Sequence, residues 1–229
     1  WTTISKAVGS VESGVPHNCP TADGKEIQKS SYRALKNGIK LNDVFKMVKK
    51  YKNNQNAKPL ILMGYYQMIF NYGEKKFIIE CKKAGVNGLI VVDLSYPDNK
   101  KFASLCKKNS ICFIQLIAPT TNIERMKEIV KISHGMVYMI SMISTTGSTL
   151  KVTTRKIMKN YDIIKKVNPS KNVAIGFGIT EKTIASLKKA NGLVVGSALC
   201  KEISKSIKNR QNPVTNVINI VNKLKKKIS

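Results

Sequence analysis

Short apolar runs alternate with longer lysine-rich stretches along most of the chain. Such near-continuous apolar runs are typical of strands that are covered on both faces, as in a parallel sheet. The strand-like runs are residues 7–15, 59–66, 88–94, 111–118, 135–141, 172–178 and 192–198. Stretches with helical spacing lie between them, around residues 41–52, 74–85, 98–108, 122–133, 153–167, 180–190 and 199–207. The alternation predicts a repeated βα unit.

Two α/β architectures are built from this repeat, an open doubly wound sheet and a (β/α)8 barrel. No G-x-G-x-x-G follows the first apolar run, and residues suited to a site gather at the carboxyl ends of the runs, where barrels carry their active sites. These residues are Glu12, Tyr65, Asp93, Tyr138, Gly178 and Ser197. We therefore predict one TIM-type (β/α)8 barrel domain over residues 1–229. Seven runs leave it one strand short of eight.

Composition narrows the class of protein. With 42% hydrophobic residues the chain can bury a core. It has no apolar run near the roughly 18 residues that a membrane span needs. The first ten residues lack the features of a secretory signal. Five cysteines form no C-x-x-C pair, so neither a metal site nor a disulfide framework is expected. A cytoplasmic protein is predicted.

The charge raises a different possibility. Lys and Arg number 40 against 13 Asp and Glu, a formal net charge of +27, which is compatible with a nucleic-acid-binding protein. However, only four of these residues are arginine, and the lysines are spread along the chain instead of clustering with aromatic residues. We interpret most of them as solvated helix faces. Nucleic-acid binding remains an alternative, although we expect none.

Glycine turns follow the last two apolar runs. One is Gly176-Phe177-Gly178, and the other is Gly196-Ser197, which opens a helical stretch. Gly147 lies in the loop after the preceding run. In barrels the loops after the last two strands, together with a helix N-terminus, bind phosphate through backbone N–H groups. Each glycine could simply end a strand, but together they predict a phosphorylated small-molecule ligand.

Two carboxylates flank the loop after the first run. Glu12 lies near the end of the run and Asp23 lies in an Ala-Asp-Gly turn, with two prolines between them. Such a pair suits general acid–base chemistry if the loop folds Asp23 over Glu12. The alternative is a solvent-facing strand-end glutamate and an ordinary turn aspartate.

The segment "ESGVPHNCPTADGKEIQ" (residues 12–28) resembles the signature E-x-G-x-P-x-S-D-P-x-A-D-G-x-x-I-Q of the tryptophan synthase α subunit family. Further matches follow in the family's order, so that the resemblance covers nearly the whole chain from about residue 7. They are residues 62–73, 84–94, 117–126, 135–141, 176–180 and 194–198.

The resemblance implies a lyase of tryptophan biosynthesis that cleaves indole-3-glycerol phosphate into indole and glyceraldehyde 3-phosphate. Glu12 would be the catalytic acid/base and Asp23 the second catalytic carboxylate. The positions that line the family's indole pocket are occupied by Tyr65, Val92, Ile117 and Tyr138. The alternative is that these residues belong to the barrel core. The expected partner is a β subunit in an αββα heterotetramer. Pyridoxal phosphate is expected only in that partner, and this chain is expected to hold neither cofactor nor metal.

The chain also departs from the family's pattern. Cys19 stands where the family has an aspartate that couples the two subunits, and Met142 stands at an arginine position near the Gly147 loop. Little of the family's first βα unit precedes Ala7, so the resemblance implies a barrel that lacks most of this unit. A catalytically decayed α subunit that only binds and activates its partner is therefore a second hypothesis. Histidines 17 and 134 have no spacing typical of a metal site or a triad, so the sequence gives them no role.

Overall fold

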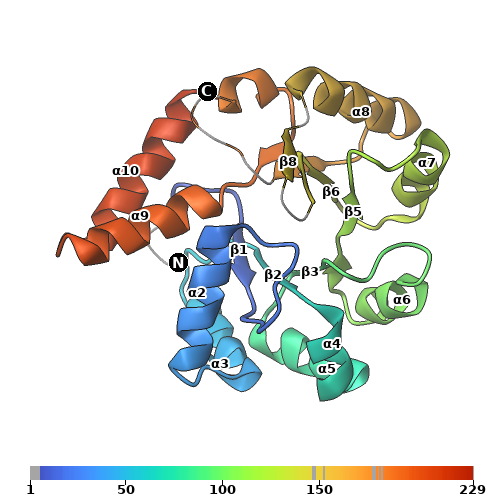
Figure 1. The fold of residues 1–229 in the computed structure, drawn as a ribbon. Coiled ribbons are helices and arrows are strands. Elements are labelled where there is room, and N and C mark those ends of the chain that lie inside the picture. Colours follow the sequence, from blue (N-terminus) through green and yellow to red (C-terminus); the bar gives the residue numbers. More distant parts are fainter. Residues whose placement is uncertain are drawn as a thin grey trace. The chain divides into compact units, whose positions relative to one another are not determined.

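The computed structural model describes residues 6–145, 148–151, 153–176, 179, 181 and 183–228. The chain divides into two compact units. The first comprises Trp1–Phe113 with Cys200–Asn222, and the second comprises Ile114–Leu199 with Lys223–Ser229. Each unit contains its own parallel sheet covered by helices (Figure 1).

The first unit is built on a four-stranded parallel sheet in the order β1-β2-β3-β4. Its strands are β1 (Val11–Gly14), β2 (Leu60–Gly64), β3 (Gly88–Val91) and β4 (Cys112–Phe113). Each strand lies within a predicted apolar run, and almost all residues of β2 and β3 are buried, as expected for a sheet covered on both faces. The strands run parallel, so their carboxyl ends share one edge of the sheet.

The helices of the first unit bury apolar residues to different extents. They are α2 (Lys25–Lys36), α3 (Leu41–Lys52), α4 (Tyr66–Tyr72), α5 (Glu74–Ala84) and α6 (Lys100–Lys108), together with most of α9 (Ser197–Lys208) and α10 (Pro213–Lys226). The predicted helical face of residues 77–84 is the buried face of α5, formed by Phe77, Ile78, Cys81 and Ala84. α5 ends at Gly85, whose φ of 89° is left-handed, as the stop signal predicts.

The sequence analysis does not predict α2, α4 or α10. α2 has few apolar residues and buries none of its residues, so it lacks the apolar content by which the other helices are recognised. α4 is only 7 residues long, and its first residue, Tyr66, is the last residue of the predicted strand run 59–66. These helices are found only from the structure.

The second unit carries a four-stranded parallel sheet in the order β10-β9-β6-β5. Its strands are β5 (Gln115–Ile117), β6 (Val137–Ile140), β9 (Val173–Gly176) and β10 (Gly192–Leu193), and its helices are α7 (Ile123–Ile132) and α8 (Thr154–Val167). The predicted run 111–118 is divided at Ile114 into β4 and β5, which belong to different sheets. The helix expected over 180–190 reduces, among its described residues, to the 3-10 turn η1 (Ile184–Leu187).

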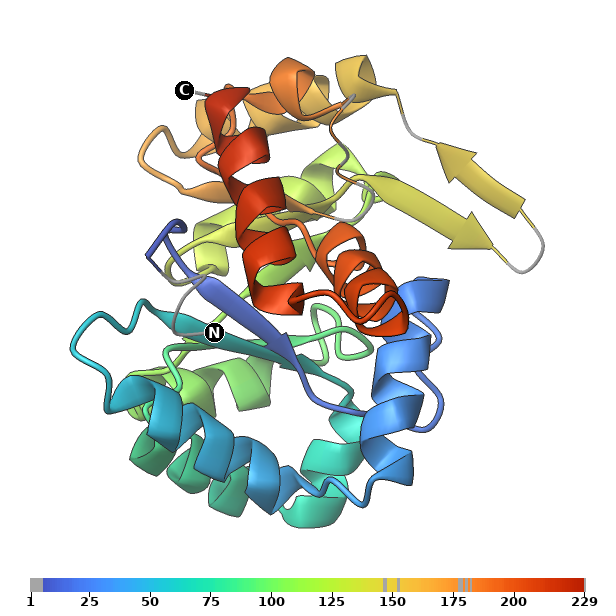
Figure 2. The ribbon, with the colours of Figure 1, turned by 90° about the vertical axis from the view of Figure 1, so that its left-hand side faces the viewer.

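A hairpin that the sequence analysis does not predict follows β6. β7 (Met142–Thr145) and β8 (Ser148–Lys151) pair antiparallel as a two-stranded ribbon (Figure 2). The segment is rich in Ser and Thr and lacks the apolar run that identifies the other strands. Its pairing is local, so periodicity alone does not reveal it.

Gly176 ends β9 against the ring of Tyr138 on β6. A Cβ atom added at Gly176 would collide with the hydroxyl and Cζ of Tyr138 and would lie 2.8 Å from its Cε1. Tyr138 is only 2% exposed, so its ring has no solvent-filled space into which it could turn. The close approach requires glycine at this strand end.

We expect Gly176→Ala to lower the free energy of unfolding by about 1–3 kcal/mol, because the added methyl group overpacks the contact with Tyr138. Urea unfolding followed by circular dichroism measures this. Gly14→Ala is the matched control, because Gly14 also ends a strand and a Cβ there has no neighbour within 4 Å. Equal losses in the two variants would contradict the packing argument.

Candidate active site

Glu12 lies on β1, where it is paired with Ile61 of the neighbouring strand β2. Its side chain is half-buried, and two flanking residues, Val11 and Val15, are buried core residues. Burial, with a smaller contribution from the nearby charge of Asp23, raises the pKa of Glu12 to about 7. Near neutral pH this carboxyl group is therefore populated in both its protonated and its ionised form.

Asp23 is held at the end of β2 by Tyr65. The Tyr65 hydroxyl donates a hydrogen bond of 3.1 Å to Oδ2 of Asp23. The same hydroxyl accepts a 3.0 Å hydrogen bond from the backbone N–H of Ala22. Burial raises the pKa of Asp23, while the Tyr65 hydrogen bond and the charge of His17 act in the opposite direction. Asp23 also contributes to the raised pKa of Glu12, so the loop after β1 brings the two carboxyl groups within electrostatic reach of one another.

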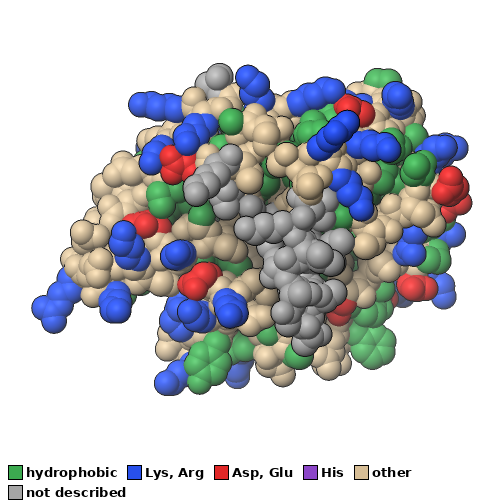
Figure 3. Space-filling view, turned by 45° about the horizontal axis from the view of Figure 1, so that its top comes forward, with side chains coloured by type: hydrophobic (Ala, Val, Ile, Leu, Met, Phe, Trp, Pro, Cys, Tyr) green, Lys and Arg blue, Asp and Glu red, His purple; other side chains and the backbone are tan. Residues whose placement is uncertain are grey.

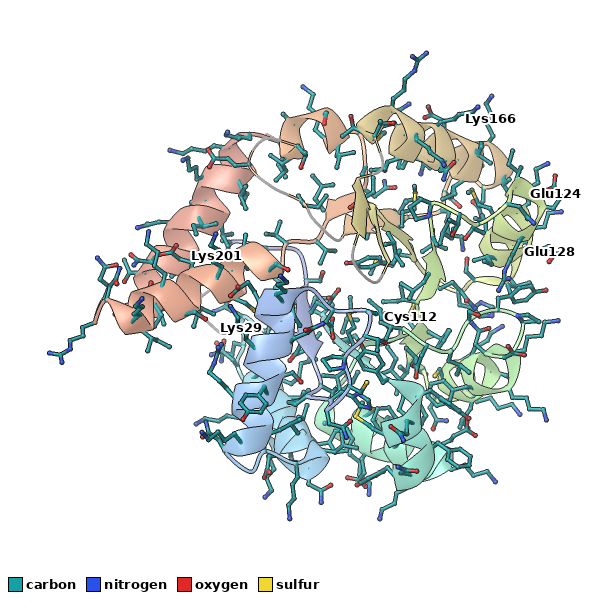
Figure 4. The ribbon with its side chains drawn as sticks, in the orientation of Figure 1. Lys29, Cys112, Glu124, Glu128, Lys166 and Lys201 are labelled. Atoms are coloured by element: carbon teal, nitrogen blue, oxygen red, sulfur yellow. The ribbon has the colours of Figure 1, made fainter. Side chains whose placement is uncertain are left out.

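Three acidic residues elsewhere in the chain lie at the surface. Glu124 and Glu128 are exposed and point outward from α7 (Figure 4). Hydrogen bonds from Lys227 and Lys223 hold the pKa of Glu181 below its usual value. Burial instead raises the pKa values of Glu12 on β1 and of Asp23 in the following loop, which is typical of acid–base sites.

His17 lies against Tyr65, a placement that the sequence analysis missed. The two rings are stacked, with centroids 4.6 Å apart and an interplanar angle of 23°. The backbone N–H of Cys19 donates a 3.1 Å hydrogen bond to Nδ1 of His17. On α2, Ser31 Oγ accepts from the backbone N–H of His17 at 2.8 Å and donates to its carbonyl oxygen at 2.9 Å. No spacing rule predicts this contact, because it depends on the course of the loop.

Asp93 and Val92 follow β3 at the same edge of the sheet. Oδ1 of Asp93 accepts a 2.7 Å hydrogen bond from the backbone N–H of Tyr66, the first residue of α4. An acceptor there also stabilises the positive end of the helix dipole. Val92 is half-buried, and its N–H donates to the carbonyl oxygen of Gly64 at 3.0 Å. Tyr65, Val92 and Asp93 therefore all lie at the carboxyl edge of the first unit's sheet.

The remaining predicted binding residues lie in the second unit. Ile117 and Tyr138 are 1% and 2% exposed, on β5 and β6. The carbonyl oxygen of Gly176 accepts hydrogen bonds from the backbone N–H and the hydroxyl of Ser141, at 2.9 and 2.6 Å. Gly196 and Ser197 are exposed where α9 begins. Gly147, Phe177 and Gly178 lie outside the described residues. The binding roles of all these residues stay predictions.

Within the described ranges, no group of three or more His, Cys, Asp or Glu side chains is arranged to hold a metal ion. In the same part of the chain, no helix is both long enough and apolar enough to cross a membrane.

Comparison with known proteins identifies the family. A family model described as tryptophan synthase alpha chain matches residues 3–229. The chain belongs to the tryptophan synthase alpha chain family. The tryptophan synthase alpha chain of Pelagibacter ubique is 65% identical over 227 residues, which are 99% of this chain and 86% of the relative. That of Pyrococcus furiosus is 39% identical over 205 residues, 87% of this chain and 81% of the relative.

Solved structures of the family share the fold. Tryptophan synthase subunit alpha from Legionella pneumophila matches with a TM-score of 0.87 at 28% identity, over 99% of this chain and 84% of that one. A chain from the tryptophan synthase a2b2 complex of Pyrococcus furiosus matches with a TM-score of 0.83 at 34% identity, over 98% and 88%. The predicted family and the predicted (β/α)8 fold class are therefore confirmed.

The raised pKa of Glu12 predicts a pH dependence of stability. The folded chain holds this proton up to about pH 7, whereas the ordinary value is 4.5, so between these limits the folded state binds more protons than the unfolded state. The free energy of unfolding should therefore fall as pH rises through this window, by up to about 3 kcal/mol. Well above pH 7 the folded state carries the full cost of ionising this buried carboxyl group.

Urea unfolding of wild type and Glu12→Gln at pH 4.5, 6 and 8 measures this contribution together with its coupling to Asp23, because groups that do not interact with Glu12 cancel in the difference. We expect Glu12→Gln to gain stability relative to wild type as pH rises. A difference that does not change with pH would show that Glu12 has an ordinary pKa.

Proposed function

We propose that this chain catalyses the retro-aldol cleavage of indole-3-glycerol phosphate to indole and glyceraldehyde 3-phosphate. Membership in the tryptophan synthase alpha chain family supports a lyase role in tryptophan synthesis. The observation that carries the specific reaction is the pair of interacting carboxyl groups, Glu12 and Asp23, in different environments at one sheet edge. A cleavage that needs an acid and an anion at different places is suited to such a pair.

In this mechanism protonated Glu12 adds its proton to the indole ring carbon that carries the glycerol side chain. The ring nitrogen then bears positive charge, which the Asp23 carboxylate stabilises beside its N–H. Ionised Glu12 next removes the proton from the adjacent hydroxyl of the side chain. The carbon–carbon bond breaks, its electron pair forms the ring carbon–carbon double bond, the C=N pair returns to the ring nitrogen, and indole and the aldehyde leave. Glu12 ends protonated, so no other reactant is consumed.

We propose, as the family resemblance implies, that the substrate phosphate is bound by the glycine turns. Gly196 and Ser197 open α9, a helix of 12 residues whose first N–H groups have no helical partner. Backbone N–H groups at a helix start bind phosphate without a charged side chain. Gly147, Phe177 and Gly178 are proposed to complete this group.

Indole made here is proposed to pass to a β subunit that carries pyridoxal phosphate, within the cytoplasm. Support comes from the relative of Pyrococcus furiosus, whose chain was solved in an a2b2 complex. This chain would then supply the lyase reaction, with no cofactor of its own, and the partner would supply the cofactor chemistry.

The two alternatives predict different observations. A decayed subunit would release no indole, alone or with its partner. A nucleic-acid reader would concentrate its cations, but Lys and Arg are scattered over the face seen in Figure 3, with acidic residues among them. This distribution argues against a nucleic-acid reader, and the assay of indole release separates the lyase from the decayed subunit.

We expect Glu12→Gln and Asp23→Asn each to lower kcat for indole release by at least about 100-fold, because each loses a group that acts in the transition state. Circular dichroism should show an unchanged fold. Glu80→Gln is the control, because Glu80 pairs only with Lys83 on the surface of α5. Near-native turnover in Glu12→Gln would refute the acid–base assignment.

The mechanism also predicts a pH profile. The free enzyme must hold Glu12 in its protonated form, and burial raises the pKa of Glu12 to about 7. The value of kcat/KM should therefore fall as pH rises above 7. Steady-state assays of indole release between pH 5 and 9 test this. A kcat/KM that stays constant up to pH 9 would be incompatible with Glu12 as the initial proton donor.

A further inference from the structure

We propose that His17 is a positioning residue that holds Tyr65, and through it Asp23, in place for the reaction. This inference rests on the proposed function, because it assigns Asp23 a task in that reaction. In this proposal His17 does not contact the substrate. It acts through two further side chains, and the sequence alone assigned it no role.

The first support is the ring stack. The imidazole of His17 lies almost parallel to the Tyr65 ring, with 4.6 Å between the centroids. Stacked aromatic pairs contribute about 0.5–1.5 kcal/mol beyond burial, and they restrict the rotation of both rings. Tyr65 is only 5% exposed, so with His17 on one face its ring is enclosed.

The second support is the anchoring of His17 itself. Its backbone N–H and carbonyl group both bond to Ser31 Oγ on α2, the helix on which Lys29 is labelled in Figure 4. Its Nδ1 accepts the N–H of Cys19. In this hydrogen bond Nδ1 carries no proton, so the ring is neutral with its proton on Nε2. The positive charge that lowers the pKa of Asp23 belongs to the protonated ring, in which Nδ1 no longer accepts. His17 is thereby fixed at its backbone and at its ring, as a positioning residue must be.

The third support is the continuous chain of contacts that ends at the carboxylate. The Tyr65 hydroxyl joins the Ala22 N–H to Oδ2 of Asp23. A rotated Tyr65 would break both bonds and release the turn that presents Asp23. The position of the carboxylate therefore depends on the orientation of Tyr65, and that orientation depends on His17.

The fourth support is electrostatic. The ionisable groups that act on this cluster are Glu12 from β1, Tyr65 after β2, Asp93 after β3 and His17 from the loop. Of these, His17 and the Tyr65 hydrogen bond lower the pKa of Asp23. Losing the imidazole removes one of these effects directly and weakens the other. Substitution of His17 should therefore raise the pKa of Asp23.

Two substitutions separate the roles of the ring and of Nδ1. His17→Asn removes the ring but keeps a side-chain oxygen that can accept from the N–H two residues on. His17→Phe keeps the stack but has neither the acceptor nor the charge. His134→Phe is the matched control, because His134 is exposed and belongs to the other unit. The readouts are kcat, KM, the acid limb of kcat/KM, and the pKa of Asp23 from carboxyl carbon NMR.

We expect His17→Asn to lower kcat by about 10-fold or more with KM changed less than about 3-fold, because the loss affects the transition state more than binding. His17→Phe should keep kcat within about 3-fold of wild type, since the stack remains. In both variants the acid limb and the NMR-measured pKa of Asp23 should move to higher pH. The substrate phosphate titrates equally in all assays and cancels in the comparison.

The inference is wrong if His17→Asn keeps both wild-type kcat and the wild-type pKa of Asp23. It is also wrong if His134→Phe produces the same changes. Should His17→Asn fail to fold, an unchanged pKa of Asp23 in His17→Phe would overturn the electrostatic coupling. Inactive wild type would instead refute the proposed function, while the NMR titration would still test the link between His17 and Asp23.

Discussion

The removal of the Glu12 carboxyl group from water is the constraint on which the candidate site depends. Charging a buried carboxyl group is unfavourable, and a second carboxyl group nearby makes it more so. Burial is the largest influence on the pKa of both groups, but Asp23 also receives the Tyr65 hydrogen bond, which offsets part of its shift. The same functional group, a carboxyl, thereby serves two tasks. Glu12 can hold a proton near neutral pH, and Asp23 is helped to keep its negative charge.

This arrangement is produced within a single unit of the chain. The parallel pairing of β1 with β2 sets Glu12 opposite Ile61, and Tyr65 follows the last residue of β2 at the same edge. Parallel strands present their carboxyl ends together, so the site needs only one loop, residues 15–24, to bring the second carboxyl group. The relative placement of the two acids therefore depends on a short register and a short loop.

Sequence reasoning succeeded where burial leaves a pattern. The runs that became β2, β3, β6 and β9 are apolar because both faces of these strands are covered, and the buried face of α5 follows the predicted spacing. It failed where burial does not act on the pattern. α2 has no buried residue, and the β7–β8 hairpin pairs locally without an apolar run. Both carboxylates were found because their residue types and the family's signature identify them, although their catalytic roles stay predictions.

His17 shows why positioning residues escape such reasoning. A histidine is recognised from sequence by its spacing to other ligands or triad members, and His17 has none. Its neighbours in space are Tyr65, which follows a different strand, and Ser31, which lies on a helix that the sequence did not predict. The contact exists only because the loop after β1 lies between these two elements. Residues that perform chemistry carry that chemistry in their side chains, whereas a residue that orients them is defined by contacts, and contacts require the fold.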